Sequence, residues 1–64
     1  MTVLEFVVFD AQGTEIDWYD PLISYIEEPF GWQVQTDYDT YIVIRPEGGR
    51  CEVRSRSVDQ AVTS

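Results

Sequence analysis

The chain begins with an apolar segment whose hydrophobic residues occupy both faces of an extended strand. In Thr2–Phe9, apolar side chains fill odd and even positions alike, and Glu5 is the one charged exception. β-Branched and aromatic residues are typical of strands, and apolar residues on both faces are typical of a strand that is covered on both sides. The pattern therefore predicts a central strand over these residues.

Three later segments also have the composition of strands: two alternate between apolar and polar residues, as half-buried strands do, and the middle one is rich in β-branched and aromatic residues. They are Trp32–Thr36, Thr40–Arg45 and Arg50–Arg56. Asp37–Asp39 and Pro46–Gly49 separate them and have the composition of tight turns. We therefore predict three short strands in mainly antiparallel pairing, with the last one at an edge of the sheet.

The segment between the first strand and these three is less regular. Asp10–Gly13 carries turn residues, and Thr14–Trp18 is long enough for a short strand that completes a hairpin. Asp20 followed by Pro21 is typical of a helix start. Apolar residues then recur near helical spacing until Gly31, so we predict a helix of about two to three turns.

Together these elements predict an α+β fold formed by a single domain, residues 1–64. A mainly antiparallel sheet of four to five short strands would carry one short helix packed on one face. The end of the chain leaves two alternatives open. Ser57–Val62 either begins a last helix, with Ser57 and Gln60 at capping-box spacing, or forms a frayed tail.

Composition describes a folded chain with a thin core. The 64 residues are 44% apolar and 14% aromatic, too much for a disordered acidic tail. A domain of this size buries only roughly 60% of the surface that its unfolded chain exposes. The lone Cys51 cannot form an intramolecular disulfide and is interpreted as a small core residue. With Met1 followed by no basic leader or long apolar run, we expect a cytoplasmic protein.

Charge changes this picture most. Twelve acidic residues face four arginines, without lysine or histidine, for a net charge of −8. Residues 1–44 hold nine acids and no base, which sum to −9, while residues 45–64 hold four arginines and three acids, which sum to +1. Such asymmetry favours a basic partner. It argues against direct binding to nucleic acid or to an anionic membrane.

Catalytic chemistry is sparse in the sequence. Without histidine there is no neutral-pH acid–base group, no Ser-His-Asp triad and no activating base for Cys51. Gly48-Gly49 lacks the spacing and the lysine of a phosphate-binding loop. The oxygen-bearing residues from Asp10 to Asp17 resemble a calcium loop only faintly, and we favour a polar hairpin turn. We therefore expect no enzyme activity, no metal and no cofactor.

The distinctive group is a set of acidic residues interleaved with aromatic ones. Taken singly, each member is better explained as a solvated charge or a packed ring. Collectively, so many acids without a base cost self-repulsion, which a basic partner or a saline solvent would offset. The candidate partner-binding residues are Glu15, Asp17, Trp18, Tyr19, Asp20, Glu27, Glu28, Asp37, Tyr38 and Asp39. For the arginines we favour internal pairing with Glu52 and neighbouring acids over a second contact strip.

The leading hypothesis is nucleic-acid mimicry, in which carboxylates occupy a groove lined by lysine and arginine. Aromatic anchors within the charged field would supply binding energy. In the acidic run from Glu15 to Asp39 and the base-free first 44 positions, the chain resembles small phage-encoded anti-CRISPR inhibitors. The resemblance implies a target at the DNA- or RNA-binding surface of a CRISPR effector complex, in the host cytoplasm.

Two alternatives belong to other classes. The first is a small structural or subunit-interaction protein whose acidity is a solubility or high-salt adaptation, which the absence of lysine fits. The second is an antitoxin or adaptor that neutralises one basic protein. Arg50–Arg56 could pair with its twin across a two-fold axis, but its charges discourage this, so we favour a monomer.

Overall fold

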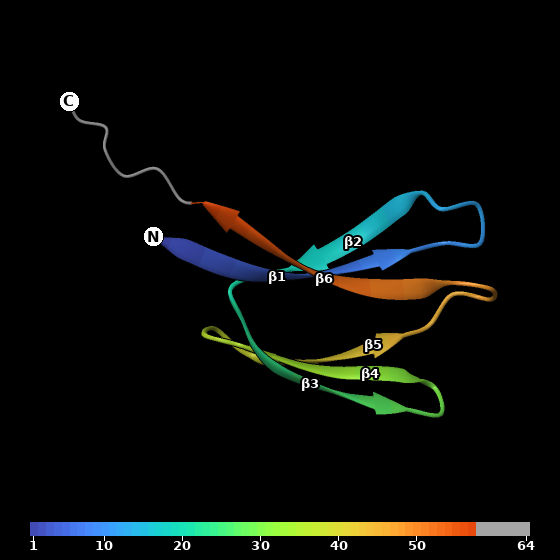
Figure 1. The fold of residues 1–64 in the computed structure, drawn as a ribbon. Coiled ribbons are helices and arrows are strands. Elements are labelled where there is room, and N and C mark those ends of the chain that lie inside the picture. The colour runs from blue at the N-terminus through green and yellow to red at the C-terminus, as the bar shows by residue number, and fades with distance from the viewer. Residues whose placement is uncertain (58–64) are drawn as a thin grey trace.

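The structure, a computed structural model that describes residues 1–57, is all-β (Figure 1). The predicted α+β class is therefore wrong, because the described residues contain six strands and no helix. The strands are β1 (Thr2–Phe9), β2 (Glu15–Tyr19), β3 (Leu22–Glu28), β4 (Gly31–Thr36), β5 (Thr40–Ile44) and β6 (Arg50–Ser57). Of the predicted elements, every strand is confirmed, including the short one after the first turn.

The six strands form two antiparallel sheets of three. The first sheet has the order β2-β1-β6 and the second has the order β3-β4-β5. β1 is central, as predicted, and β6 lies at an edge, as predicted. Because each sheet has only three strands, four of the six strands are edges. Figure 1 shows the β4–β5 turn at one end of the molecule and the β1–β2 and β5–β6 turns at the other.

The predicted helix after Asp20 is instead β3. Leu22, Ile23 and Ile26 fit helical spacing, but β-branched and aromatic residues dominate the segment and favour a strand. β3 pairs with β4 along almost its whole length, with an irregularity after Leu22. The helix-start residues Asp20 and Pro21 favour a helix only weakly, and the pairing of β3 with β4 outweighs them. The connection from β2 contains a cis Asp20–Pro21 peptide bond.

The core lies between the sheets and is built around Phe6 of β1. Its ring centroid lies 5.0 Å from that of Tyr25 and 5.6 Å from that of Trp32, both on the second sheet. The remaining buried members of this cluster are Val8, Val34 and Val43. Cys51 is only partly buried and packs against the cluster, in keeping with its predicted place. The core is thin, since most other large apolar side chains are exposed.

Two turns show why the chain reverses where it does. The Asp10 carboxylate accepts hydrogen bonds from the backbone N–H groups of Gln12 and Thr14, each at 2.9 Å, and Gly13 has a positive φ of 83°. The interpretation of this segment as a polar hairpin turn is thus confirmed. At the β3–β4 turn, a Cβ on Gly31 would lie 2.1 Å from the Val43 carbonyl oxygen, so only glycine fits there.

The alternative elements for Ser57–Val62 fall almost wholly outside the described residues, since only Ser57 is described, as the last residue of β6. Within residues 1–57, no helix has the length and apolar character needed to cross a bilayer.

Candidate partner-binding surface

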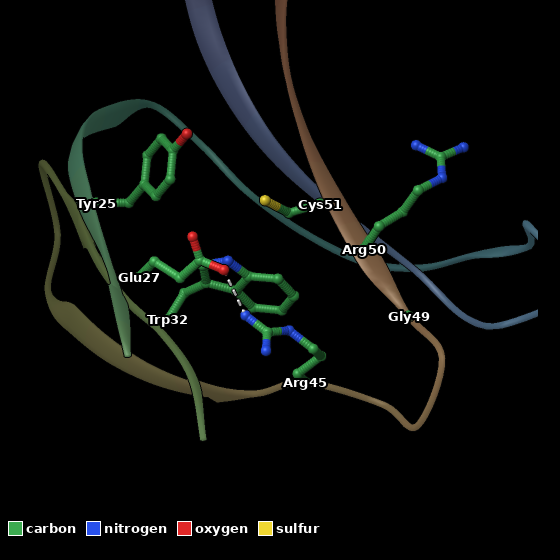
Figure 2. A pocket seen from close by; sticks show the side chains of 7 residues that line it. All are labelled: Tyr25, Glu27, Trp32, Arg45, Gly49, Arg50 and Cys51. Atoms are coloured by element: carbon green, nitrogen blue, oxygen red, sulfur yellow. Dashed lines mark hydrogen bonds and ion pairs between the residues drawn. The ribbon is translucent and has the colours of Figure 1, made fainter. Parts of the chain in front are cut away.

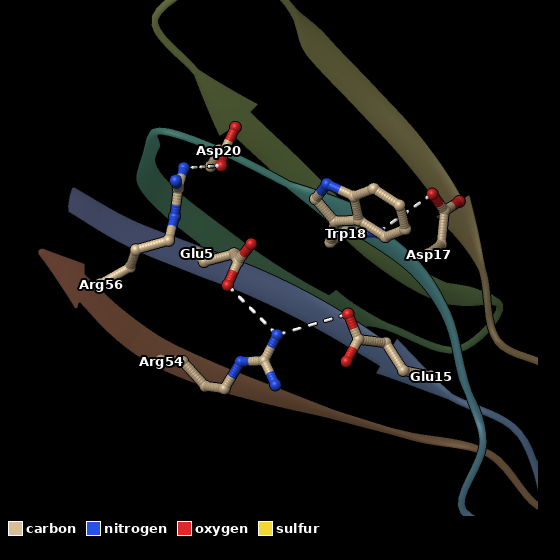
Figure 3. A network of polar contacts seen from close by, with 7 residues as sticks. All are labelled: Glu5, Glu15, Asp17, Trp18, Asp20, Arg54 and Arg56. Atoms are coloured by element: carbon tan, nitrogen blue, oxygen red, sulfur yellow. Dashed lines mark hydrogen bonds and ion pairs between the residues drawn. The ribbon is translucent and has the colours of Figure 1, made fainter. Parts of the chain in front are cut away.

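On the outer face of the first sheet, arginines from β6 bind acids from β1, β2 and the β2–β3 connection (Figure 3). The Arg54 guanidinium lies 3.2 Å from the Glu5 carboxylate and 3.3 Å from that of Glu15. Arg56 forms an ion pair with Asp20. Desolvation lowers the pKa of Arg54, but its hydrogen bonds to the two glutamates outweigh this and raise it. These charges are therefore held within the molecule.

The other two arginines are also paired. Arg45 contacts Glu27 at 2.8 Å and lies over the Trp32 ring, 4.8 Å from its centroid. Arg50 contacts Glu52 at 3.1 Å. Internal pairing of the arginines, which the sequence favoured, is confirmed. Residues 1–44 contain no basic residue, but arginines from later in the chain contact four of their acids.

Pairing leaves a smaller group of carboxylates for a partner. Within residues 1–57, six acids have no ion pair: Asp10, Asp17, Glu28, Asp37, Asp39 and Glu47. All but Asp17 lie at a strand end or in a turn. The turn that contains Asp37 and Asp39 lies at one end of the molecule, whereas Asp10, Glu28 and Glu47 belong to turns or strand ends at the other (Figure 1), so these carboxylates do not form one cluster.

On β2, the three candidates Asp17, Trp18 and Tyr19 have different surroundings. Trp18 is exposed, at 56% of its surface, on the outer side beside Val7. Tyr19 lies inward, 5.1 Å from the Tyr41 ring of β5, and its hydroxyl donates to the Asp17 carboxylate at 2.7 Å. Burial, followed by this hydrogen bond and the negative charge of Asp17, raises the pKa of Tyr19 to about 12. Tyr19 is thus a fixed structural group rather than a free anchor.

The β4–β5 turn presents the most exposed candidates on a rigid support. Its side chains Asp37, Tyr38 and Asp39 all face solvent, and Tyr38 is 80% exposed. The buried Thr36 hydroxyl accepts hydrogen bonds from the backbone N–H groups of Tyr38 and Asp39 at 3.1 and 3.2 Å. The Thr36 N–H donates to the Asp39 carbonyl at 2.9 Å, closing the turn. We call residues 37–39 the acidic turn.

A shallow cleft opens between β6 and the second sheet, with a volume of about 470 Å³ (Figure 2). Tyr25, Trp32, Cys51 and the Glu27–Arg45 pair line it. Burial and the negative charge of Glu27 raise the pKa of the Cys51 thiol, so it is not activated as a nucleophile.

The structure separates the ten sequence-predicted residues into distinct groups. Glu15, Asp20 and Glu27 are held by arginines, and Tyr19 packs against the core. Asp17 accepts the hydrogen bond from Tyr19, and Glu28 has no ion pair with a described residue. Trp18 and the acidic turn face solvent. The sequence analysis missed Thr36, which holds the acidic turn in shape. A threonine directly before Asp-Tyr-Asp is a signal that could have identified it, since threonine hydroxyls commonly close such turns.

Residues 1–57 contain no group of three or more histidine, cysteine, aspartate or glutamate side chains arranged to hold a metal ion. Comparisons of the chain with protein-family models, with curated proteins and with solved structures find no match.

Proposed function

We propose that this protein is a non-catalytic, acidic binding protein that occupies the basic groove of a nucleic-acid-binding protein and so blocks it. Because the chain resembles anti-CRISPR inhibitors, we propose a CRISPR effector complex as the target. The acidic turn is the leading contact, and the other unpaired carboxylates assist its approach.

The observation that carries the proposal is the exposure of Tyr38 between two unpaired carboxylates on a preorganised turn. An exposed tyrosine is a common anchor in interfaces and stacks on arginine side chains. Asp37 and Asp39 supply acceptors for the same basic residues. Because Thr36 already fixes the backbone, binding loses little conformational entropy there.

Charge density limits how much of a duplex the protein imitates. A duplex as long as the eight-residue β1, about 27 Å at roughly 3.4 Å per residue, carries about 16 phosphates at one per 1.7 Å. The six carboxylates without an ion pair in residues 1–57 fall well below this. The proposal is therefore local mimicry, in which a few phosphate positions and one base-like ring are replaced.

The test is capture from a cell lysate on immobilised protein, with duplex DNA or RNA as competitor. We expect a basic nucleic-acid-binding protein to be retained and to be released by nucleic acid. Added salt should weaken binding steeply, since exposed charges are screened within about 10 Å at 0.1 M salt. Retention that nucleic acid does not affect would refute competition for a groove.

A pair of matched variants tests the acidic turn. D37K/D39K is expected to lose binding, whereas E28K/E47K, at the opposite end of the molecule, should retain most of it. Both variants change the net charge equally, and neither removes an ion pair of the described residues. Equal loss in both would show that total charge, not the turn, determines binding. Tyr38→Ala should weaken binding while leaving charge unchanged.

A further inference from the structure

The four edge strands differ in how they are protected against pairing with another chain. β2, β3 and β6 each carry charged side chains, which discourage a new strand from adding. β5 has the sequence TYIVI, without a charge, a proline or a glycine. Among the described strands it pairs only with β4, so its other side is free.

The hydrogen-bond pattern shows which backbone groups face this free side. Backbone bonds join Arg45 to Phe30 and Thr36 to Asp39, one step beyond each end of the β4–β5 ladder. Bonded pairs alternate along an antiparallel ladder. The groups of Tyr41 and Val43 therefore point to β4. Those of Thr40, Ile42 and Ile44 point away, to the free side.

We propose that β5 pairs with β5 of a second copy of this chain, antiparallel about a two-fold axis at Ile42, to form one continuous six-stranded sheet. This register brings the outward backbone groups into bonded pairs, Ile42 with its twin and Ile44 with Thr40 of the second copy. Shifting the register by two residues in either direction would leave one of these pairs unmade. The interface is isologous, as a two-fold requires.

Charge complementarity supports the same register. Asp39 and Arg45 flank β5 on its two ends, and pairing about Ile42 places Asp39 of one copy directly opposite Arg45 of the second copy. Directly opposite side chains in an antiparallel pair lie about 4.5–5.5 Å apart at Cβ. Asp39 currently accepts a hydrogen bond from the Thr40 N–H at 2.8 Å. Its transfer to the arginine, which also contacts Glu27 of its own copy at 2.8 Å, would release that N–H to pair with Ile44 of the second copy.

The outer face beside this edge is also suited to contact with a like-charged copy. Ile42 and Ile44 are exposed there, with Gln33 of β4 in register between Ile42 and Ile26. Two copies that each carry −8 repel one another, so an uncharged strip is the place where they can meet. The Tyr19–Tyr41 contact brings β2, with Asp17, to the inner face at the same edge. Salt should therefore strengthen the dimer, opposite to its effect on a basic partner.

The test is sedimentation velocity on the whole chain over a concentration series, at low and at molar sodium chloride. We expect a monomer–dimer equilibrium that shifts toward dimer with salt. Ile42→Glu, which places two carboxylates opposite each other at the two-fold, should weaken the dimer by roughly tenfold or more. Gln33→Glu is the matched control, because it adds the same charge to the same face on the central strand and should leave the equilibrium nearly unchanged.

Cysteine cross-linking in a Cys51→Ser background tests the register. Ile42→Cys should oxidise to a disulfide dimer, because bonded pairs have Cα atoms about 5.5 Å apart and disulfides span about 4.4–6.8 Å. Ile44→Cys should not, because its twin lies four residues along the strand, about 14 Å away. Equal cross-linking of both variants, or a monomer at every concentration and salt, would overturn the proposal.

Discussion

The outer faces of the two sheets differ in the side chains that they expose to solvent. On the first sheet, Arg54 and Arg56 hold three acids, and Val7 is fully buried beneath the charged side chains. On the second sheet, the isoleucines are exposed, with Ile42 at 61%, and the Glu27–Arg45 ion pair lies on the inner side, in the cleft over Trp32. The outer face of the first sheet is therefore covered by paired charges, whereas that of the second sheet is apolar and exposed.

Val7 is buried and the isoleucines are exposed because different side chains flank them. The apolar stems of arginine and glutamate can cover a neighbouring valine while their charged ends reach water. In register, Val7 lies between Trp18 of β2 and Glu52 of β6, both long enough to shield it. Ile26 and Ile42 lie on edge strands, so the long side chain of Gln33 covers each of them from one side only. A charged residue on the first sheet should thus matter for stability, and one on the second sheet should matter less.

The largest expected effect comes from removing the residue that joins the two sheets. Phe6→Ala deletes a buried ring that contacts β3 and β4, at a cost of about 3–5 kcal/mol in free energy of unfolding. Because a domain of this size has only roughly 0.05–0.15 kcal/mol per residue of stability, we expect it to unfold. In the Trp18→Phe protein with Phe6 intact, circular dichroism and the fluorescence of Trp32 should report one shared unfolding transition. Separate transitions would show that the sheets fold independently.

The second effect tests the first sheet alone. Arg54→Met leaves Glu5, which is only 8% exposed, without its cation, and should lower the free energy of unfolding by more than the loss of an exposed ion pair does. The double variant E5Q/R54M should recover part of this loss, because a neutral amide needs no counter-charge. Urea unfolding of the two single variants and the double variant gives the coupling free energy. A coupling near zero would mean that the pair does not stabilise the fold.

Much of this fold was predictable from alternation and turn residues. β1, β4 and β6 have patterns that tertiary contacts reinforce, so their prediction was confirmed. β3 was not predictable in the same way. Its start has the residues of a helix cap, and only pairing with β4 decides the segment for a strand.

The sequence indicates which acidic and aromatic residues belong to the candidate site, but not how they are arranged in space. Nothing in the sequence shows that Arg54 reaches Glu5, 49 positions earlier, or that Arg56 reaches Asp20. Such pairing depends on β6 returning beside β1, a contact that no local pattern encodes. The exposure of Tyr38, by contrast, follows from its place in a turn that the sequence does predict.

A smaller loss of stability is expected from the ion pair of the second sheet. Glu27→Gln removes the ion pair with Arg45, but the Glu27 side chain is 73% exposed. Screening by solvent limits such pairs to roughly 0–1 kcal/mol. Urea unfolding at 0.05 and 1 M sodium chloride should show a small loss that vanishes in salt. A loss as large as that of Arg54→Met would contradict the contrast between the two sheets.

The smallest effect is a pH dependence where the sheets meet at Tyr19. Its pKa is about 12 in the folded chain, against an ordinary value of 10.0, so folding favours the neutral phenol. The stability that this phenol contributes is fully present below pH 10 and is lost as the pH rises through about 12. The wild-type protein should therefore lose free energy of unfolding relative to Tyr19→Phe over that interval.

Urea unfolding of both proteins at pH 8, 10 and 11 measures this difference, and the wild-type curve should fall toward the variant as the pH rises. Asp17→Asn provides the control, because it removes the charge beside the phenol. In that variant the decline should begin at a lower pH, because the negative charge of Asp17 no longer adds to the effect of burial on the pKa of Tyr19. Parallel curves for the wild type and Tyr19→Phe would mean that Tyr19 ionises equally in the folded and unfolded chains. The contact between β2 and β5 would then be open to water rather than part of the core.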